Sequence, residues 1–171
     1  AILSIVLAAS CSSDDDFQPT EDDTVVEDTN LTGDIDSDRI LDPTQQYTIS
    51  GSVFVKDGAK LTIPAGTEIV AEVGTNNFIA VEQGAEIDIQ GTASLPVIMR
   101  SAGNNPGEWG GLLLCGKAPT TEGTGVIAEV AGLVYGGNEP TDSSGNIDYL
   151  IIRNAGAQIN SESQYNGLMI L

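Results

Sequence analysis

The sequence predicts a right-handed parallel β-helix, a solenoid in which each coil adds one layer of short strands. Three observations predict this fold class: a block is repeated after 26 residues, its apolar residues recur with a period of two, and glycine stands at the corner between its strands. A period of two buries one face of a strand. A repeat of this length with a corner glycine indicates stacked β coils instead of hairpins.

The repeat aligns residues 53–63 with residues 79–89, and each copy holds two short strands around a Gly-Ala corner. The match continues from residues 64–67 to residues 90–92 with one residue deleted. Equivalent apolar residues are expected to stack inside the solenoid, one coil above the other. The pairs expected to stack are Val53 with Ile79, Val55 with Val81, Leu61 with Ile87, and Ile63 with Ile89.

Residues 31–48 precede the repeat, and we expect them to cap the first coil because the open end of a solenoid needs protection. At about 25 residues per coil, residues 43–171 make roughly five coils. No C-terminal cap is visible, so we expect the natural protein to be longer. Further strands are expected at 97–99, 109–115, 149–152 and 168–171, with turn-rich connections at 101–107, 120–125 and 136–145. An antiparallel sandwich or jelly roll is the alternative fold.

Acidic side chains are concentrated near the N-terminus. The formal net charge is −19; residues 12–42 carry twelve acidic side chains and one basic, whereas residues 43–171 carry thirteen acidic and five basic. This charge repels phosphate backbones and argues against a nucleic-acid partner. The chain has no histidine, which excludes His-based catalytic triads and His metal sites.

Residues 1–10 form a short apolar run that ends in small residues. A bilayer span needs about 20 residues, so this run is too short to cross a membrane. It is typical of the apolar core and cleavage site of a secretory signal peptide, and we expect the given sequence to begin inside that signal. The alternative is a buried N-terminal strand. Residues 11–30 hold few large apolar side chains and predict a disordered acidic tether, because they cannot offset their ordering entropy.

Residues 7–11 resemble a bacterial lipobox, in which small residues precede a cysteine. The resemblance implies that Cys11 carries the lipid and becomes the mature N-terminus, where acyl chains contribute about 0.8 kcal/mol per buried CH₂ to anchoring. The alternative for Cys11 is a free thiol or a disulfide with Cys115. The acidic run that follows resembles the surface-export signal of Bacteroidota lipoproteins, with a solvated linker as the alternative. This export signal comprises Ser13, Asp14, Asp15 and Asp16.

Four segments of the body resemble a large family of Bacteroidota β-helix lipoproteins. They are residues 51–67, 108–119, 135–140 and 147–156. The resemblance covers about residues 31–171 and implies a β-helix domain over that range, secreted or exposed at the surface, with no established catalytic residues. Together with the lipid anchor it implies an outer-membrane protein that faces the cell surface. A periplasm-facing protein is the alternative.

Acidic residues on one outer stripe raise the alternative of a polysaccharide lyase or glycoside hydrolase. Glu86 and Asp88, with Glu82 nearby, are the candidate carboxylates, since such enzymes use paired carboxylates or calcium ligands with a basic residue. The basic residues, scattered over different coils, are Lys56, Lys60, Arg100 and Arg153. We prefer the interpretation that Glu86 and Asp88 form a solvated strand face. Their partners would then be Lys60 and Lys56, one coil below.

Two further residues are interpreted as structural. Trp109, beside a Gly-Gly pair, is expected to be a packing anchor, with a sugar-stacking platform as the alternative. Cys115 lies in an apolar run and is expected to be a small buried side chain. The acids of the tether lack the spacing of a calcium loop. We therefore assign no cofactor and no metal-binding residue.

The preferred functional hypothesis is a non-catalytic surface protein that acts in adhesion, in glycan binding or as a structural spacer. A rigid solenoid on a lipid anchor and a flexible tether projects a long face away from the membrane. The expected partners are the membrane, through the lipid, and a glycan or a surface protein. A β-helix fold alone does not imply an enzyme, so the lyase or hydrolase stays the alternative.

Overall fold

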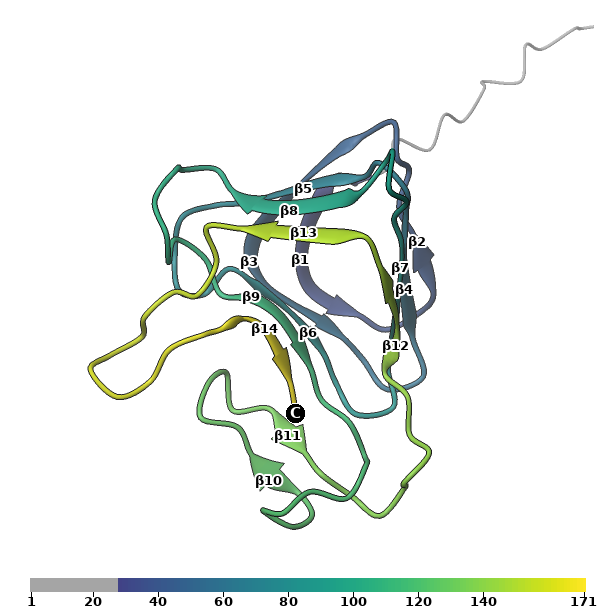
Figure 1. Ribbon diagram of the computed structural model, residues 1–171, viewed down its shortest axis with the longest axis vertical. Coiled ribbons are helices and arrows are strands. Elements are labelled where there is room, and N and C mark those ends of the chain that lie inside the picture. Colours follow the sequence, from purple (N-terminus) through teal and green to yellow (C-terminus); the bar gives the residue numbers. More distant parts are fainter. Residues whose placement is uncertain (1–27) are drawn as a thin grey trace, which may run out of the picture.

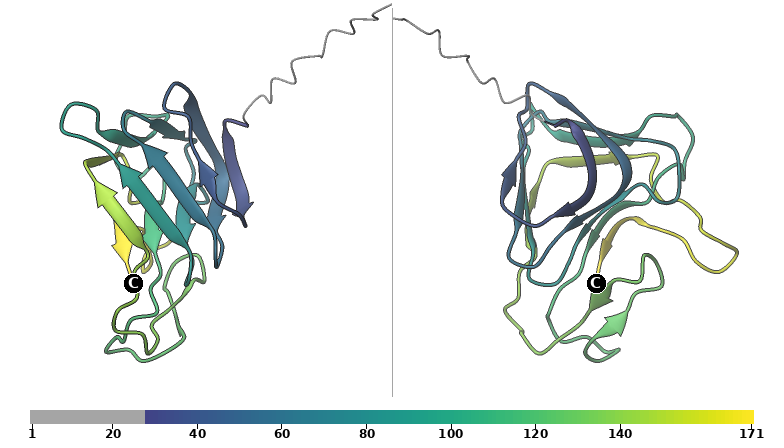
Figure 2. Two further views of the ribbon diagram at one scale, coloured as in Figure 1. Left: turned by 90° about the vertical axis from the view of Figure 1, so that its right-hand side faces the viewer. Right: turned by 180° about the vertical axis from the view of Figure 1, so that it is seen from behind.

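The computed structural model describes residues 28–171, which form a right-handed parallel β-helix. Figure 1 looks along the solenoid, and its chain runs counter-clockwise while it advances toward the viewer (Figures 1 and 2). The strands of the solenoid pair in parallel throughout, so the alternative of an antiparallel sandwich or jelly roll is wrong. Residues 28–171 offer no helix of the length and apolarity that crossing a bilayer requires.

Three stacks of parallel strands form the three faces of the solenoid (Figure 1). The first face contains the N-terminal half of β3 (Gln46–Val55), β5 (Glu68–Ala71), β8 (Val97–Ser101) and β13 (Leu150–Arg153). The second face contains the C-terminal half of β3, β6 (Phe78–Val81), β9 (Gly111–Leu114) and β14 (Gly167–Ile170). The third face contains β2 (Arg39–Ile40), β4 (Lys60–Pro64), β7 (Glu86–Gln90) and β12 (Gly145–Asp148).

Two strands turn the corner between the first and second faces. β1 (Asn30–Ile35) pairs with β3 along both of its halves, and β3 in turn pairs with β5 on one face and β6 on the other. β3 bends at Gly51, whose φ of +115° favours glycine. A Cβ at Gly51 would lie 2.9 Å from Thr32 Oγ1, so a side chain there would displace Thr32.

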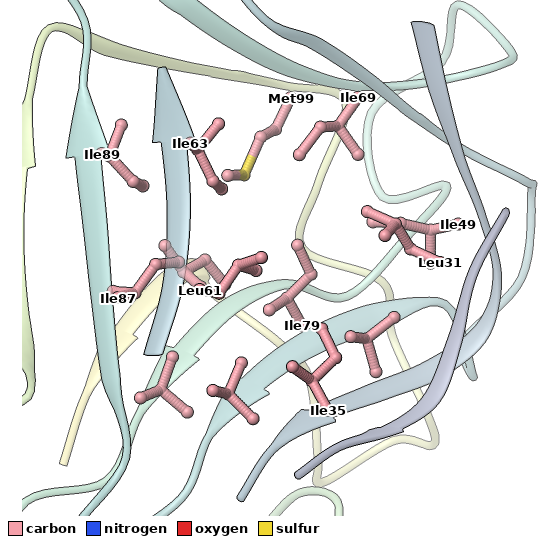
Figure 3. Packing of buried hydrophobic residues seen from close by; sticks show 14 of the residues in the cluster. Leu31, Ile35, Ile49, Leu61, Ile63, Ile69, Ile79, Ile87, Ile89 and Met99 are labelled. Carbon is pink, nitrogen blue, oxygen red and sulfur yellow. The ribbon is translucent and has the colours of Figure 1, made fainter. Parts of the chain in front are cut away.

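The register of the stacked coils confirms the predicted repeat. The stacked pairs are Val53 with Ile79, Val55 with Val81, Leu61 with Ile87, and Ile63 with Ile89. All eight side chains are at most 1% exposed. Figure 3 shows Leu61, Ile79 and Ile87 pointing into the shared interior. Because burying one such side chain contributes about 1.5–3 kcal/mol, these columns are a main source of the solenoid's stability.

The strands expected beyond the repeat are present at β8, β9, β13 and β14, within two residues of the predicted ranges. The expected number of coils is wrong, however. Residues 43–171 make four coils, because residues 116–144 leave the solenoid between β9 and β12 and add no strand to its faces.

Of residues 31–48, expected to be a cap, residues 31–45 form the first coil and residues 46–48 begin β3. β1 and β2 pair in parallel with β3 and β4, so this segment belongs to the ladder. The register shifts between Leu31 and Gly33, and Figure 2 (right) shows β1 inside the triangular outline of the other coils. Leu31, Ile35 and Leu41 are therefore at most 7% exposed, and this coil closes the end of the solenoid as a cap would.

The last coil, made of β13 and β14, lies at the opposite end of the solenoid (Figure 2, left). Leu168 stacks on Leu112 and Ile170 stacks on Leu114. Leu168 and Ile170 are 38% and 75% exposed, whereas Leu112 and Leu114 are 0% and 8% exposed. Within the described residues nothing stacks on this coil, so its interior side chains stay accessible to water.

The second face is buried on both of its sides. The outward side chains Phe78, Ala80, Leu113 and Cys115 belong to a second apolar cluster outside the solenoid. Two segments cover them, residues 116–144 and residues 154–166. The covering residues are Ala128, Val130, Leu133, Ala157 and Tyr165. The outer side of the second face is thus where the chain builds structure beyond the coils.

Candidate functional site

Residues 116–144 leave the solenoid after β9 and return as β12. We call residues 117–135 of this segment the arm. The arm contains a small antiparallel hairpin of β10 (Val126–Ile127) and β11 (Val134–Tyr135), which Figure 1 shows beside the second face. The backbone N–H of Gly136 donates to the carbonyl of Gly116 at 2.9 Å, and this hydrogen bond closes the arm at its base.

A tight turn anchors the arm to the sheet. The N–H of Ala128 donates to the carbonyl of Leu133 at 2.7 Å, and Ala131 and Gly132 between them have φ of +58° and +65°. A positive φ is uncommon for a residue with a Cβ. The conformation at Ala131 places its neighbours Val130 and Leu133 in the second apolar cluster, where they are 1% and 5% exposed. Burial of these two side chains holds the arm against the second face.

The arm and the solenoid enclose a groove of ≈ 290 Å³, here named the first groove. The solenoid contributes Phe54, Glu82 and Gln83, and the arm contributes residues 131–134. The ring of Phe54 meets the ring of Phe78 edge-on, with 5.6 Å between centroids, so packing holds its orientation. An aromatic ring beside a carboxylate and an amide offers a surface for the apolar side of a sugar and polar groups for its hydroxyls.

An ion pair borders the first groove. Lys56 Nζ donates to Glu82 Oε1 at 2.6 Å and lies 5.6 Å from the centroid of the Phe54 ring. The hydrogen bond to Glu82 raises the pKa of Lys56, so its ammonium stays protonated at neutral pH. The pair therefore offers hydrogen-bonding groups to a ligand while its two charges balance.

A second groove, of ≈ 360 Å³, lies on the side of the arm toward the last coil. It is lined by Glu129 of the arm, by Met169 of β14 and by polar residues of the segment 154–166. These polar residues are Gln158, Asn160, Ser161, Glu162, Ser163, Gln164 and Asn166. Asn160 Oδ1 accepts the backbone N–H groups of the second and third residues after it, at 2.8 and 2.9 Å, which shapes the loop. The residues lining the second groove supply amides and hydroxyls but no aromatic ring.

The predicted pairing of Glu86 is confirmed. Lys60 Nζ lies 2.6 Å from Glu86 Oε2, one coil away on the third face. The hydrogen bond to Glu86 raises the pKa of Lys60. Both side chains are nearly half exposed, so this pair contributes little to stability.

The predicted pairing of Asp88 with Lys56 is wrong. The register places Asp88 beside Thr62, and its carboxylate accepts the side-chain N–H of Gln90 at 2.7 Å. Lys56 stands at the corner after β3, where the residue one coil above is Glu82. The acidic residues are consequently spread over separate surfaces, with Asp88 on the third face and Glu82 at the first groove.

Trp109 and Cys115 have the structural roles expected of them. Trp109 is fully buried, and its Nε1–H donates to the carbonyl of Arg153 at 2.9 Å, which links the last two coils. Cys115 is buried in the second apolar cluster. Burial, with the nearby charge of Glu82, raises the pKa of the Cys115 thiol to about 11, so the reactive thiolate does not form at neutral pH.

The predicted lipidation and export residues lie outside the described residues. They are Cys11, Ser13, Asp14, Asp15 and Asp16, all within residues 1–27. The predicted signal peptide over residues 1–10 lies in the same range. Within residues 28–171, no three Cys, Asp or Glu side chains lie close enough together to hold a metal ion.

Of the residues that line the first groove, sequence reasoning singles out only Glu82, and it does so as a neighbour of Glu86 and Asp88. One signal does point to Phe54, because it occupies an outward position of the repeat where its equivalent is Ala80. A large aromatic residue on the outer side of a strand indicates that another segment covers it. Gln83 carries no such signal, since its hydrogen-bond partners lie 33 and 53 residues further along the chain.

A comparison with known protein families finds a match that spans nearly the whole solenoid. The family described as “Pectate-lyase like beta helix domain” matches residues 33–171. The match begins within β1 and includes every later strand and both grooves. A search of curated proteins found no match, and neither did a search of solved structures. The chain therefore belongs to the pectate-lyase-like β-helix family.

Proposed function

We propose that the protein is a lipid-anchored surface module that binds a glycan in the first groove without cleaving it. The observation that carries this proposal is the composition of that groove: the ring of Phe54 lies beside the Lys56–Glu82 pair and faces the wall formed by the arm. Its volume of ≈ 290 Å³ lies near the lower end of small-molecule pockets, at about 300 Å³. A groove of this size suits a short stretch of a glycan chain.

The protonation state of Lys56 favours binding over elimination. The base of a lyase must accept a proton, and it works best when its pKa is near the working pH. Glu82 raises the pKa of Lys56, so Lys56 stays charged and can only donate hydrogen bonds. Glu82 is itself held by Lys56 at 2.6 Å. The acid and the base beside the groove thus neutralise each other, and they are suited to holding hydroxyl groups.

The charge of the body favours a neutral glycan. Residues 43–171 carry thirteen acidic and five basic side chains. Four of the five basic ones already pair with carboxylates, namely Lys56, Lys60, Arg100 and Lys117. A negative surface repels an acidic polysaccharide and lowers its association rate. We therefore propose a neutral polysaccharide as the ligand class.

The N-terminal segments support the proposed location. We propose that residues 1–10 are the remnant of a signal peptide, that Cys11 carries the lipid, and that residues 11–30 are the tether of a β-helix domain over residues 31–171. The run that contains Ser13 and the three following acids would send the protein to the outer leaflet of the outer membrane, with a periplasm-facing protein as the alternative.

Palmitate labelling and protease accessibility test this location. In cells that make the whole protein, radioactive palmitate is expected to label the parent chain but not the variant Cys11→Ser. Protease added to intact cells is expected to cleave the body. Labelling of the serine variant would exclude Cys11 as the lipid site, and protection of the body in intact cells would indicate the periplasm-facing alternative.

The family description favours a second candidate function, a polysaccharide lyase or hydrolase on the same outer surface. A lyase would release unsaturated uronate products from an acidic polysaccharide such as polygalacturonate. A hydrolase would release new reducing ends. Either activity would need an acid and a base that do not already form an ion pair with each other. Lys56 and Glu82 do form such a pair.

One titration separates these candidates. The purified chain is mixed with neutral gluco- and manno-oligosaccharides and with polygalacturonate, and calorimetric binding and product formation are followed in parallel. We expect saturable binding of a neutral oligosaccharide without products. Unsaturated products or new reducing ends would replace the proposal by the enzyme alternative, and the absence of any binding would contradict it.

A matched pair of variants places the binding in the first groove. Phe54→Leu keeps the apolar volume and removes the ring, so it is expected to weaken glycan binding about tenfold, in the range of one lost aromatic contact. Tyr149→Leu is the control, since Tyr149 is 60% exposed and lines neither groove. Equal affinities of the two variants would exclude the first groove as the site.

A further inference from the structure

The corners between the second and third faces stack above one another. Asp57 and Gln83 occupy equivalent positions 26 residues apart, and each is followed by a glycine with φ of +83°. In the next coil the chain does not turn at this place, because residues 116–144 leave the solenoid instead. Two stacked corner side chains therefore face the base of the arm.

The side-chain amide of Gln83 joins the two ends of the arm. Its Nε2 donates to the carbonyl of Gly116 at 2.8 Å and to the carbonyl of Gly136 at 3.1 Å. The arm begins directly after the first of these glycines and ends directly before the second. Both hydrogen bonds are partly buried. Each carbonyl also accepts a backbone N–H, Gly116 from Gly136 at 2.9 Å and Gly136 from Gly125 at 3.1 Å, so the amide adds a second hydrogen bond to each. One amide group thus links the entry and the exit of the arm, beside the backbone hydrogen bonds there.

A second tie at the base of the arm is weaker. Asp57 Oδ1 lies 3.9 Å from Lys117 Nζ, and the side chain of Asp57 is 78% exposed, so solvent screens this pair. A Cβ at Gly84 would lie 1.9 Å from Asp57 Oδ1, which means that the carboxylate crosses over this glycine. The partly buried double hydrogen bond of Gln83 is the stronger of the two ties.

We propose that Gln83 is a positioning residue that holds the arm closed at its base and thereby sets the first groove. Residues 131–134 of the arm form one wall of this groove, and Gln83 lines the groove itself. If the arm is already ordered before the ligand binds, binding does not include the entropy cost of ordering its nineteen residues. The effect on the ligand rests on the proposed function, whereas the effect on the arm does not.

Gln83→Glu tests this inference by an isosteric change. The variant presents a carboxylate to two carbonyl oxygens and has no hydrogen to donate at neutral pH. Amide hydrogen exchange over residues 117–135 is expected to become about tenfold faster, and the affinity for the neutral oligosaccharide about tenfold weaker, since two partly buried hydrogen bonds are lost and a carboxylate lies beside two carbonyl oxygens. Gln45→Glu, the same change at an exposed turn, is the control and is expected to leave both unchanged.

Acidification and a donor-bearing variant distinguish positioning from general damage. Protonating the introduced carboxyl restores one donor, so the arm of Gln83→Glu is expected to slow its exchange reversibly as pH falls, beyond any change in the parent. The titratable groups around this corner, Asp57, Glu82, Lys117 and Asp142, are the same in both proteins. Gln83→Lys, whose ammonium can donate to both carbonyls, is expected to recover slow exchange without acid.

The two readouts separate the possible failures. Unchanged arm exchange in Gln83→Glu would overturn the positioning role, whatever the glycan affinity. Faster exchange with unchanged affinity would show that the arm wall does not set the groove. If the parent chain binds no oligosaccharide but Gln83→Glu still exchanges faster than the parent, the role of Gln83 in holding the arm stands. That result contradicts only the proposed glycan function.

Discussion

The two ends of the solenoid contain the same kind of side chain in the same column, with opposite exposure. Ile35 in the first coil and Ile170 in the last belong to one stack, which runs through Val55, Val81 and Leu114. Ile35 is 7% exposed and Ile170 is 75% exposed. β1 of the first coil lies inside the triangular outline of the other coils (Figure 2, right), whereas no strand stacks on the far side of β14 within residues 28–171.

This difference shows that the period-two alternation of apolar residues identifies which side chains point into the solenoid. It does not determine how much each of these side chains contributes to the stability of the fold. In a solenoid each coil contacts only its neighbours, so an interior side chain is buried to the extent that coils lie on both sides of it or that its own coil narrows. In the first coil, β1 lies inward of the other coils and its side chains Leu31 and Ile35 are buried. Within residues 28–171, no strand pairs with the outer edges of β13 and β14, and Leu168 and Ile170 are exposed there.

The largest expected effect compares the same substitution at the two ends. Ile35→Ala is expected to lower the free energy of unfolding by about 2–4 kcal/mol, because it opens a cavity in a closed coil. Ile170→Ala is expected to lower it by less than about 1 kcal/mol, since most of that side chain already contacts water. Urea unfolding of both variants measures the difference, and equal losses would mean that the last coil is covered in solution.

A smaller effect is expected from glycines at the two ends. Gly51→Ala is expected to lower stability by about 2 kcal/mol, through its positive φ and a Cβ placed 2.9 Å from Thr32 Oγ1. Gly167→Ala in the last coil meets only the Cβ of Ala155 at 3.6 Å, so its loss is expected to be about 1 kcal/mol, from φ alone.

A double variant checks the cause of this glycine effect. If the clash with Thr32 contributes, Thr32→Ala in the Gly51→Ala background is expected to recover part of the stability. Thermal unfolding of the single and double variants provides the measurement, and strictly additive losses would contradict the contact between the first two coils.

The smallest expected effect is electrostatic. Arg100 Nε donates to Glu68 Oε1 at 2.7 Å, between inner coils, and this hydrogen bond holds the pKa of Glu68 below its usual range. Because the folded state favours the charged form, the contribution of Glu68 is present at neutral pH and is lost as pH falls through the lowered pKa. Both side chains are about a third exposed, so Glu68→Gln is expected to cost only a few tenths of a kcal/mol.

Arg153 in the last coil is the residue to compare with Arg100 of this ion pair. Arg153 stacks in register on Arg100 but takes part in none of the ion pairs found within residues 28–171. Arg153→Gln is therefore expected to leave stability unchanged or to raise it slightly, since it removes a like charge from the stack. Urea midpoints of both variants from acidic to neutral pH measure these effects; a loss in Arg153→Gln as large as in Glu68→Gln would indicate a partner for Arg153.

How much of the molecule follows from its sequence depends on whether the contacts are repeated. The stacking of Leu61 on Ile87 and the pairing of Lys60 with Glu86 follow from the 26-residue repeat, because equivalent positions lie one above the other. Lys56 is assigned the wrong partner, since a corner residue reaches the side chain at the equivalent corner position and not one on a strand.

The arm and the first groove do not follow from the repeat. Residues 116–144 replace a corner, and their turn-rich composition predicts only that they are not solenoid strands. Gln83 holds the arm through backbone carbonyls, which carry no side-chain signal in the sequence. The outward position of Phe54 indicates a covering segment but not which one. The candidate site is thus built from contacts that occur once.

The most direct test of the account is a chemical-shift titration of the isotope-labelled chain with a neutral oligosaccharide. Binding in the first groove predicts that the largest shift changes fall on Phe54, Glu82, Gln83 and residues 131–134. The last coil and the third-face acids Glu86 and Asp88 are expected to keep their shifts, and the oligosaccharide is expected to remain intact. Shift changes centred on the third face, or cleavage of the sugar during the titration, would contradict the account.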